Sequence, residues 1–244
     1  MEEVHYLIPA ELKIIQDNRF FKFGTDSVLL ANFTEVSNGD ILVDFGSGSG
    51  VIPLLLAFKQ NPSRITGIEI QSKLVDLSRR SIILNNLQDR INIIEGDFKN
   101  ATDYIRHGSV DQVVTNPPYM PVSAGKITAD KRKAIARHEI HAELEDVVRE
   151  ASKILRFGGN FNIVHRSWRL AELISIMEKY NLAAKKLRFV QSRLDRGPDT
   201  FLLTAKKGAK KGLDVKPVLI VYEGQSSNYS KEVNEIYGVN DNEK

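Results

Sequence analysis

The sequence of 244 residues contains no cysteine. This absence excludes a disulfide framework, cysteine-ligated metal sites and thiolate nucleophiles, and it suits a reducing compartment. The sequence also has no apolar run that approaches the ~20 residues of a membrane-spanning helix. No early stretch combines a basic region, an apolar core and a cleavage site. We therefore expect a cytoplasmic protein with no metal and no membrane partner.

The net charge of +3 is distributed unevenly along the chain. Between Lys185 and Lys216 there are ten Lys or Arg and three Asp, a net +7, so the remainder of the chain carries −4. A concentrated basic region predicts a polyanionic partner. Lysines that are merely solvated around a loop are the alternative interpretation.

Apolar, strand-like runs alternate with helical patterns after a polar junction at 37–40. We expect strands at 41–45, 64–70, 91–96, 110–115, 160–165, 185–191 and 200–207, and helices at 51–60, 72–87, 98–106, 144–159 and 169–180. The last two strands have no helix between them and should pair antiparallel. The pattern predicts an α/β fold with a doubly wound, mainly parallel seven-stranded sheet and an antiparallel last strand pair.

The chain is expected to form one domain over 39–244, preceded by an N-terminal extension over 1–38. The extension should contain a hairpin or extended segment and one short helix that is capped by Thr25.

Two further local features carry expectations. The helix over 144–159 should end at a glycine pair, Gly158 and Gly159, which would supply a left-handed cap. Trp168, the single tryptophan, is expected to be a packing residue.

The segment VDFGSGSG (43–50) places Asp44 near the end of a buried strand and alternates three glycines into the next helix, at Gly46, Gly48 and Gly50. Glycines there let the backbone approach a ligand closely. Glu69 ends the next strand, where an acid accepts hydrogen bonds from ribose hydroxyls. Asp97 follows the third strand at the same edge. The turn has no P-loop lysine, and Asp44 would repel a pyrophosphate, so a nucleoside with a cationic, phosphate-free tail fits better.

These residues resemble the class I methyltransferases, which have a Rossmann-like fold and use S-adenosyl-L-methionine. The resemblance implies that Asp44 and the glycine turn hold the methionine end of this cofactor, that Glu69 holds the ribose, and that Asp97 with Phe98 holds the adenine. A Rossmann dehydrogenase is the structural competitor. The motif of such a dehydrogenase has two residues between its second and third glycines. Here only Ser49 separates Gly48 from Gly50, so this spacing is not met.

The segment NPPY (116–119) follows the fourth strand, and its prolines hold the chain extended. In class I methyltransferases an Asn/Asp-Pro-Pro-aromatic motif marks methyl transfer to a planar nitrogen. The Asn116 side-chain oxygen and the Pro117 carbonyl would accept the hydrogens of an exocyclic amine and favour the pyramidal state reached during attack. Tyr119 offers a face on which a base can stack. A rigid loop with a packed tyrosine is the alternative.

Further segments narrow the resemblance. FKFGTDSVLLANF (21–33), ARHE (136–139) and VLIVYEGQSSNYSKEVNEIYG (218–238), together with the two motifs above, resemble the bacterial tRNA methyltransferases that modify the adenine next to the anticodon of valine tRNA. The resemblance covers nearly the whole chain. It implies a tRNA (adenine-N(6)-)methyltransferase. We expect the extension over 1–38 to lie on the substrate side or to act as a cofactor lid.

Two other functions stay open from the sequence. The NPPY motif also occurs in the glutamine methyltransferases that modify peptide release factors, although those enzymes carry a separate N-terminal helical domain and only ~38 residues precede the first strand here. A catalytically idle RNA-binding module with a vestigial cofactor fold is the second alternative.

Contacts with tRNA are expected from basic residues in the loop after Tyr119 and in the segment between Lys185 and Lys216. Phosphate attraction combined with extrusion of a loop base is how an enzyme of this kind reaches a base atom. The expected RNA-binding residues are Lys126, Lys131, Arg132, Lys133, Arg137, Arg193, Arg196, Lys206 and Lys207.

Overall fold

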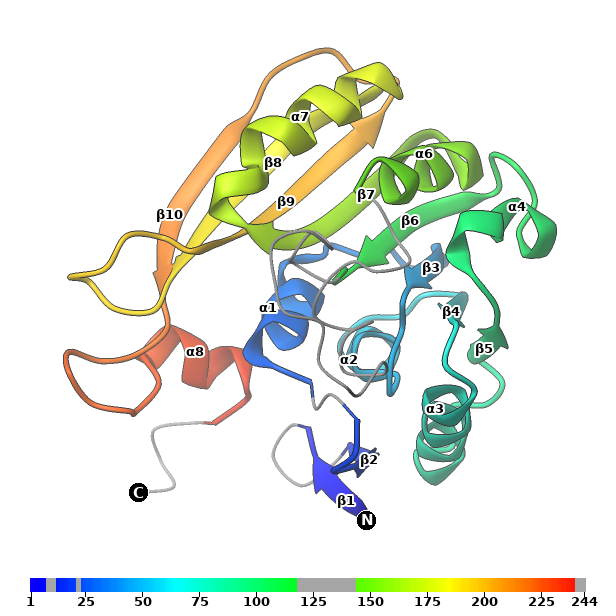
Figure 1. Cartoon of the computed structure of the whole chain (residues 1–244), viewed down its shortest axis with the longest axis horizontal. Coiled ribbons are helices and arrows are strands. Elements are labelled where there is room, and N and C mark those ends of the chain that lie inside the picture. Colours follow the sequence, from blue (N-terminus) through cyan, green and yellow to red (C-terminus); the bar gives the residue numbers. More distant parts are fainter. Residues whose placement is uncertain (8–11, 21–22, 118–143, 240–244) are drawn as a thin grey trace.

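The structure, a computed structural model, describes residues 1–7, 12–20, 23–117 and 144–239 (Figure 1). Its centre is an eight-stranded sheet with the strand order β10-β8-β9-β7-β6-β3-β4-β5. The strands of this sheet are β3 (Ile41–Phe45), β4 (Arg64–Glu69), β5 (Ile91–Glu95), β6 (Val110–Thr115), β7 (Leu155–Arg166), β8 (Leu182–Gln191), β9 (Thr200–Lys207) and β10 (Asp214–Ile220).

The sheet confirms the expected α/β class and the antiparallel last pair. Strands β3 to β7 are parallel, and β9 is antiparallel to both β7 and β8. The expected number of seven strands is wrong, since β10 adds an eighth, parallel to β8. Most residues of β10 are exposed and one is Pro217, so the strand lacks the apolar pattern by which it could have been recognised. Proline is tolerated there because β10 lies at the edge of the sheet.

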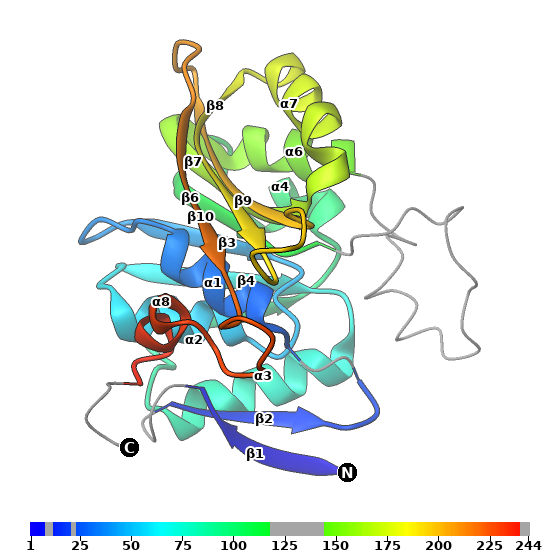
Figure 2. The same ribbon diagram turned by 90° about the vertical axis from the view of Figure 1, so that its left-hand side faces the viewer.

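Helices cover both faces of the sheet and enclose two apolar cores (Figure 2). Neighbouring residues of one strand point to opposite faces, so Leu42 packs in one core and Val43 in the other. The first core is completed by α1 (Thr25–Phe33), α2 (Val51–Lys59), α3 (Ser72–Leu84) and α8 (Lys231–Ile236), and the second by α4 (Ala101–Tyr104), α6 (Leu144–Ile154) and α7 (Leu170–Lys179).

The expected glycine cap at the end of α6 is wrong. The helix ends at Ile154, and Gly158 (φ +79°) and Gly159 lie inside β7. The ladder between β6 and β7 shifts register there. A Cβ atom on Gly159 would lie 3.0 Å from the carbonyl oxygens of Arg156 and Asp111. The glycine pair therefore serves an irregularity in the strand, where the backbone passes close to its neighbour.

The N-terminal segment begins with an antiparallel hairpin of β1 (Glu2–Tyr6) and β2 (Lys13–Asp17), which lies alongside α3 (Figure 2). The backbone N–H of Ile15 donates to the Ser81 hydroxyl at 2.9 Å. This bond ties the hairpin to the helix.

Helix α1 follows the hairpin and does not begin as expected. Thr25 is its first residue, and Gly24 occupies the cap position without a side-chain cap. The expectation that Thr25 caps the helix is therefore wrong. The Thr25 hydroxyl instead lies 3.3 Å from the Tyr229 hydroxyl, which joins the start of α1 to the C-terminal part of the chain.

Candidate active site

The parallel strands bring the predicted site residues to one edge of the sheet. Asp44 and Glu69 lie at the carboxyl ends of β3 and β4, Asp97 follows β5, and Asn116 follows β6. Strand β3 lies between β4 and β6, which is where the strand order reverses. Open α/β sheets bind ligands at such a switch point, outside the carboxyl ends of their strands.

The turn from β3 to α2 has a backbone that favours glycine. Gly46, Gly48 and Gly50 have φ values of +69°, +55° and +86°, a region that other residues rarely adopt. A Cβ atom on Gly50 would lie only 2.3 Å from the Ser78 hydroxyl oxygen of α3. The three glycines therefore allow a tight turn that opens directly into the first turn of α2.

Glu69 holds this turn in place. Its carboxylate accepts hydrogen bonds from the backbone N–H groups of Gly48 and Gln71, each at 2.8 Å. Burial raises the pKa of Glu69, against the lowering by these N–H donors. A carboxylate has about four acceptor positions, so Glu69 retains capacity for further donors such as hydroxyl groups.

Asp44 is buried beside Glu69, with 2% of its surface exposed. Within the described part of the chain neither of its carboxylate oxygens has a hydrogen-bond partner. Burial first, and the charge of Glu69 second, raise the pKa of Asp44 well above the usual range of a carboxyl group. A buried acid without partners is unfavourable by itself, so this position suits a ligand that carries a positive charge.

Asp97 and Phe98 lie beyond β5, on the other side of Glu69 from β6. Asp97 accepts a hydrogen bond from the backbone N–H of Lys99 at 2.9 Å and caps the short helix η1 (Phe98–Asn100). The Phe98 ring stacks on Phe45, with centroids 5.2 Å apart and planes 14° apart. Phe98 is thereby fixed as a half-buried apolar wall at the end of β3.

Asn116 is held from two directions at the end of β6. The Thr115 hydroxyl donates to the Phe45 carbonyl at 3.0 Å, which fixes the end of β6 to β3. The Asn116 amide nitrogen donates to the Ser27 hydroxyl of α1 at 2.9 Å. Asn116 is half-buried and Pro117 is buried, while Tyr119 lies outside the described residues.

Ser27 contacts the candidate site, and the sequence did not indicate this contact. It lies within the segment 21–33, but no local pattern links it to Asn116, which is 89 residues away. The contact arises only because α1 packs above the sheet, where Val28 and Leu30 are fully buried.

The expected RNA-binding residues divide between two edges of the sheet. Strand β8 runs parallel to β7, so the loop 192–199 after it, with Arg193 and the exposed Arg196, lies on the same edge as Asn116. Strand β9 runs the opposite way, as its arrow in Figure 1 shows, and carries Lys206 and Lys207 to the other edge. The other expected residues, Lys126, Lys131, Arg132, Lys133 and Arg137, lie outside the described residues.

Lys207 already has partners within the protein. Its ammonium group donates to the carbonyl oxygens of Ser152 at 2.6 Å and Leu155 at 2.8 Å, and partial burial lowers its pKa. These contacts stabilise the end of α6. The structure thus gives Lys207 a structural role, on the edge away from Asn116.

Arg193 joins a stack of tyrosines. Its guanidinium lies 5.4 Å from the ring centroid of Tyr222 and donates to the Gly224 carbonyl at 2.6 Å. Tyr222 stacks on Tyr229, and Tyr229 on Tyr237, with centroids 5.5 and 5.2 Å apart. The stack extends from the loop 192–199 to the start of α1, where Tyr229 contacts Thr25. It thereby supports the helix that carries Ser27.

The expectation that Trp168 is a packing residue is wrong. Trp168 follows β7 in the short helix η3 (Ser167–Arg169) and is 61% exposed.

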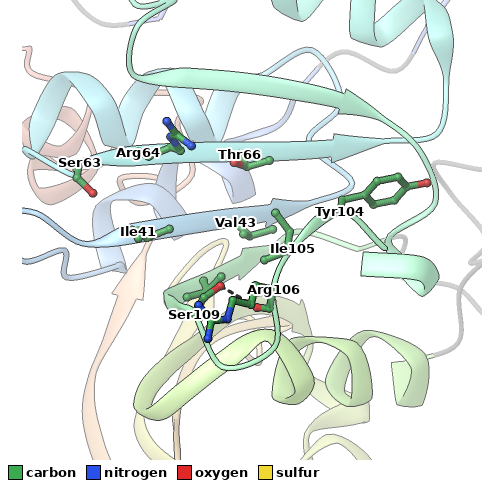
Figure 3. A pocket seen from close by; sticks show the side chains of 10 residues that line it. Ile41, Val43, Ser63, Arg64, Thr66, Tyr104, Ile105, Arg106 and Ser109 are labelled. Carbon is green, nitrogen blue, oxygen red and sulfur yellow. Dashed lines mark hydrogen bonds between the residues drawn. The ribbon is translucent and has the colours of Figure 1, made fainter. Parts of the chain in front are cut away.

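A pocket of about 450 Å³ lies elsewhere, at the amino end of β3 and β4 (Figure 3). Ile41 and Arg64 begin these strands and line it together with Tyr104 and Arg106. None of the predicted site residues lines this pocket.

Within the described ranges no three His, Asp or Glu residues gather where they could hold a metal ion. Of the helices described there, none is long and apolar enough to cross a membrane.

Known proteins resemble this chain in sequence and in fold. The family model of the methyltransferase small domain matches residues 21–193. A tRNA1(Val) (adenine(37)-N6)-methyltransferase of Porphyromonas gingivalis is 30% identical over 187 residues, 74% of this chain and 72% of that one. The enzyme of the same name from Aeromonas hydrophila is 29% identical over 205 residues, which cover 82% of this chain and 83% of the relative.

Solved structures show the same fold. A protein of Agrobacterium tumefaciens described as a predicted O-methyltransferase superposes with a TM-score of 0.70 at 22% identity, over 88% of this chain and 96% of that one. Geranyl diphosphate C-methyltransferase of Streptomyces coelicolor, solved with S-adenosyl-L-homocysteine, gives a TM-score of 0.57 at 14% identity, over 74% and 76% of the two chains.

Proposed function

The chain belongs to the methyltransferase small domain family, and we infer from this membership and from its site that it is a tRNA methyltransferase. It uses S-adenosyl-L-methionine to methylate the exocyclic amine of an adenine. The observation that carries the proposal is the placement of Asn116: its amide is fixed at the end of β6, next to β3. Strand β3 carries Asp44, whose carboxylate has no partner among the described residues. A planar amine and a cationic methyl donor fit these two groups.

The residues at the ends of β3, β4 and β5 fit the cofactor. Asp44 and the backbone of the turn 46–50 would hold its positively charged methionine end, and Glu69 its ribose hydroxyls. Asp97 and Phe98 would hold its adenine ring. When bound, the cofactor supplies an electrophilic methyl group on a sulfonium.

Asn116 and Pro117 prepare the amine for attack. The amide oxygen is the acceptor of an asparagine side chain, so this oxygen would accept a hydrogen bond from the substrate amine, while the amide nitrogen donates to Ser27. The lone pair of an exocyclic amine is delocalised into its ring, and acceptors on its hydrogens favour the pyramidal form that can attack a carbon atom. Interactions that strengthen in the transition state raise the rate. Direct transfer needs no covalent nucleophile, and the methylated amine loses its proton readily.

We further propose that the substrate is adenine 37 of a valine tRNA, the nucleotide named for the two bacterial relatives. Transfer of a labelled methyl group into total tRNA and into protein extract tests the reaction class, and nucleoside digestion identifies the product. We expect labelled N6-methyladenosine in valine tRNA, and no label when adenine 37 is replaced by guanine. Label in protein and none in RNA would contradict the proposal in favour of glutamine methylation.

A further inference from the structure

Trp168 lies at the same edge of the sheet as Asn116, which follows β6. Thr115, the last residue of β6, pairs with Ile163 of β7, and β7 continues past this pair to Arg166 before η3 begins. Because the two strands are parallel, Trp168 projects from the same edge as Asn116, one strand further from the cofactor residues. Ile163 and Trp168 are five positions apart, so a chain that rises about 3.3 Å per residue keeps Trp168 within roughly 15–20 Å of the end of β6.

The indole ring is exposed on a rigid support. The Arg169 guanidinium lies 5.5 Å from its ring centroid, and Arg169 is itself only 5% exposed. Glu172 binds that guanidinium with both carboxylate oxygens, at 2.8 and 2.6 Å. The backbone N–H of Ser167 donates to the Asp199 carbonyl at 3.0 Å, which joins η3 to the loop 192–199. The support is therefore fixed on both sides of the tryptophan.

The loop 192–199 extends this surface. It presents Leu194, which is 80% exposed, and the exposed Arg196. The carboxylates nearby are engaged by the protein itself: Asp199 contacts Arg166 at 3.7 Å, and Asp195 accepts from Gln225 at 3.3 Å. An exposed large aromatic ring, an exposed aliphatic side chain and an exposed cation on one edge favour a partner with flat bases and negative charge.

We propose that Trp168 is a stacking surface for an unpaired RNA base that neighbours the acceptor adenine, with Arg196 facing the RNA backbone. The inference rests on the proposed function, because it concerns the same substrate. Sequence-specific RNA enzymes act on loops whose bases are splayed out and stacked on aromatic side chains. Loss of one such contact weakens binding by about tenfold or more.

The single tryptophan makes the proposal directly measurable. Because Trp168 is the only tryptophan of the chain, the intrinsic tryptophan fluorescence of the protein reports on this residue alone. Titration with an RNA stem-loop that carries the target adenine in its loop should quench the fluorescence. A fully paired RNA duplex of the same length should quench it much less.

Substitutions provide the second measurement. We expect Trp168→Ala to raise KM for the stem-loop about tenfold, with kcat and cofactor affinity unchanged, and Trp168→Phe to retain most of the affinity. The matched control is Phe157→Ala, since Phe157 is a 74% exposed aromatic residue near the amino end of β7, whereas Trp168 follows the carboxyl end of that strand. Phe157→Ala should leave KM unchanged.

Two results separate this inference from the proposed function. If the wild type methylates the stem-loop, but its fluorescence does not change on saturation or Trp168→Ala keeps the wild-type KM, then the stacking surface is wrong and the methyltransferase assignment stands. If the wild type methylates neither tRNA nor the stem-loop under conditions in which it binds the cofactor, then the proposed function fails and this inference fails with it.

Discussion

The cofactor side and the acceptor side of the candidate active site are built in different ways. The cofactor side consists of Asp44, Glu69 and Asp97 at successive strand ends, with a glycine turn that directly follows β3 and is bound by Glu69 at the end of the next strand. The acceptor side depends on contacts between distant segments: Ser27 with Asn116 across 89 residues, and Thr25 with Tyr229 across 204. A contiguous motif can be recognised in a sequence, whereas an assembly of this kind exists only in the fold.

The two sides also differ in how their polar groups are satisfied. On the cofactor side the Asp44 carboxylate is buried without a partner among the described residues. On the acceptor side Asn116 and Thr25 each contact a hydroxyl group. Substitutions on the two sides should therefore have different effects. On the acceptor side they should lower kcat. At Asp44 they should weaken cofactor binding and stabilise the ligand-free protein, because an unfavourable buried acid is removed.

The largest effect is expected at Asn116. Asn116→Ala removes the side-chain acceptor, and loss of one such transition-state hydrogen bond lowers kcat by roughly 10²–10³-fold. Cofactor affinity, measured by calorimetry, should stay within about twofold because the cofactor side is intact. Ser27→Ala is the matched control: it removes the same contact but leaves the amide oxygen, so kcat should fall by about tenfold or less. Equal losses of kcat in both variants would mean that the hydrogen bond between Asn116 and Ser27, and not the Asn116 amide oxygen, is needed for the reaction.

The glycine turn gives the next effect, on stability. Gly50→Ala places a methyl group 2.3 Å from the Ser78 oxygen in a backbone with φ +86°. Backbone strain and overpacking together should lower the free energy of unfolding by about 3 kcal/mol. Gly46→Ala has the strain (φ +69°) but no atom within 4 Å, so about 1–2 kcal/mol is expected. Denaturant unfolding measures both.

A control for this series is Gly24→Ala. Gly24 has φ −103°, and no atom lies within 4 Å of the added methyl group. The free energy of unfolding of the Gly24→Ala variant should therefore match that of the wild type. If Gly50→Ala were no worse than Gly46→Ala, the packing of the turn against α3 would have no part in the effect.

Asp44 connects cofactor binding to pH. The pKa of Asp44 is raised in the folded protein, so the ligand-free fold favours the protonated acid. Stability from this group is fully present below its ordinary pKa of 3.8 and is lost as the pH rises through the raised value. Asp44→Asn should therefore raise the melting temperature of the ligand-free protein more at pH 8 than at pH 5.

The same substitution should weaken cofactor binding by roughly 10–100-fold, as expected for the loss of a charge-assisted contact. Wild-type affinity for the cofactor should fall as the pH is lowered through the raised pKa of Asp44, because the cation binds the ionised acid. Calorimetry at several pH values measures the cofactor affinity of the wild type and of the variant. An affinity that is independent of pH in the wild type would show that Asp44 does not face the positive charge.

The difference between the two sides explains what the sequence could predict. The sequence could predict that Asp44 and Glu69 lie together at one edge of the sheet, because each comes near the end of a buried strand and parallel strands place their carboxyl ends together. It could not predict the contact of Ser27 with Asn116, because this contact depends on the packing of α1. The sequence does not indicate the eighth strand, because Asp214–Ile220 has no apolar alternation. The glycine pair at 158–159 is compatible with both a helix cap and a strand irregularity, because both use glycine.

The distribution of basic residues in the fold also differs from their distribution along the chain. From the sequence, the Lys and Arg residues between Lys185 and Lys216 form one segment. In the fold the antiparallel β9 separates them, so Arg196 lies on the edge of Asn116 and Lys206 on the opposite edge. A count along the chain contains no information on strand direction.

The smallest effect tests this separation. Arg196→Gln should weaken tRNA binding a few-fold and lower the slope of log affinity against log salt by about 1, because one phosphate contact is lost. Lys206→Gln removes the same charge from an exposed position on the other edge and should leave both quantities unchanged. Filter binding at several salt concentrations measures the slopes. If Lys206→Gln flattened the slope as much as Arg196→Gln, the RNA would extend over both edges of the sheet, and the acceptor side would be larger than the carboxyl edge alone.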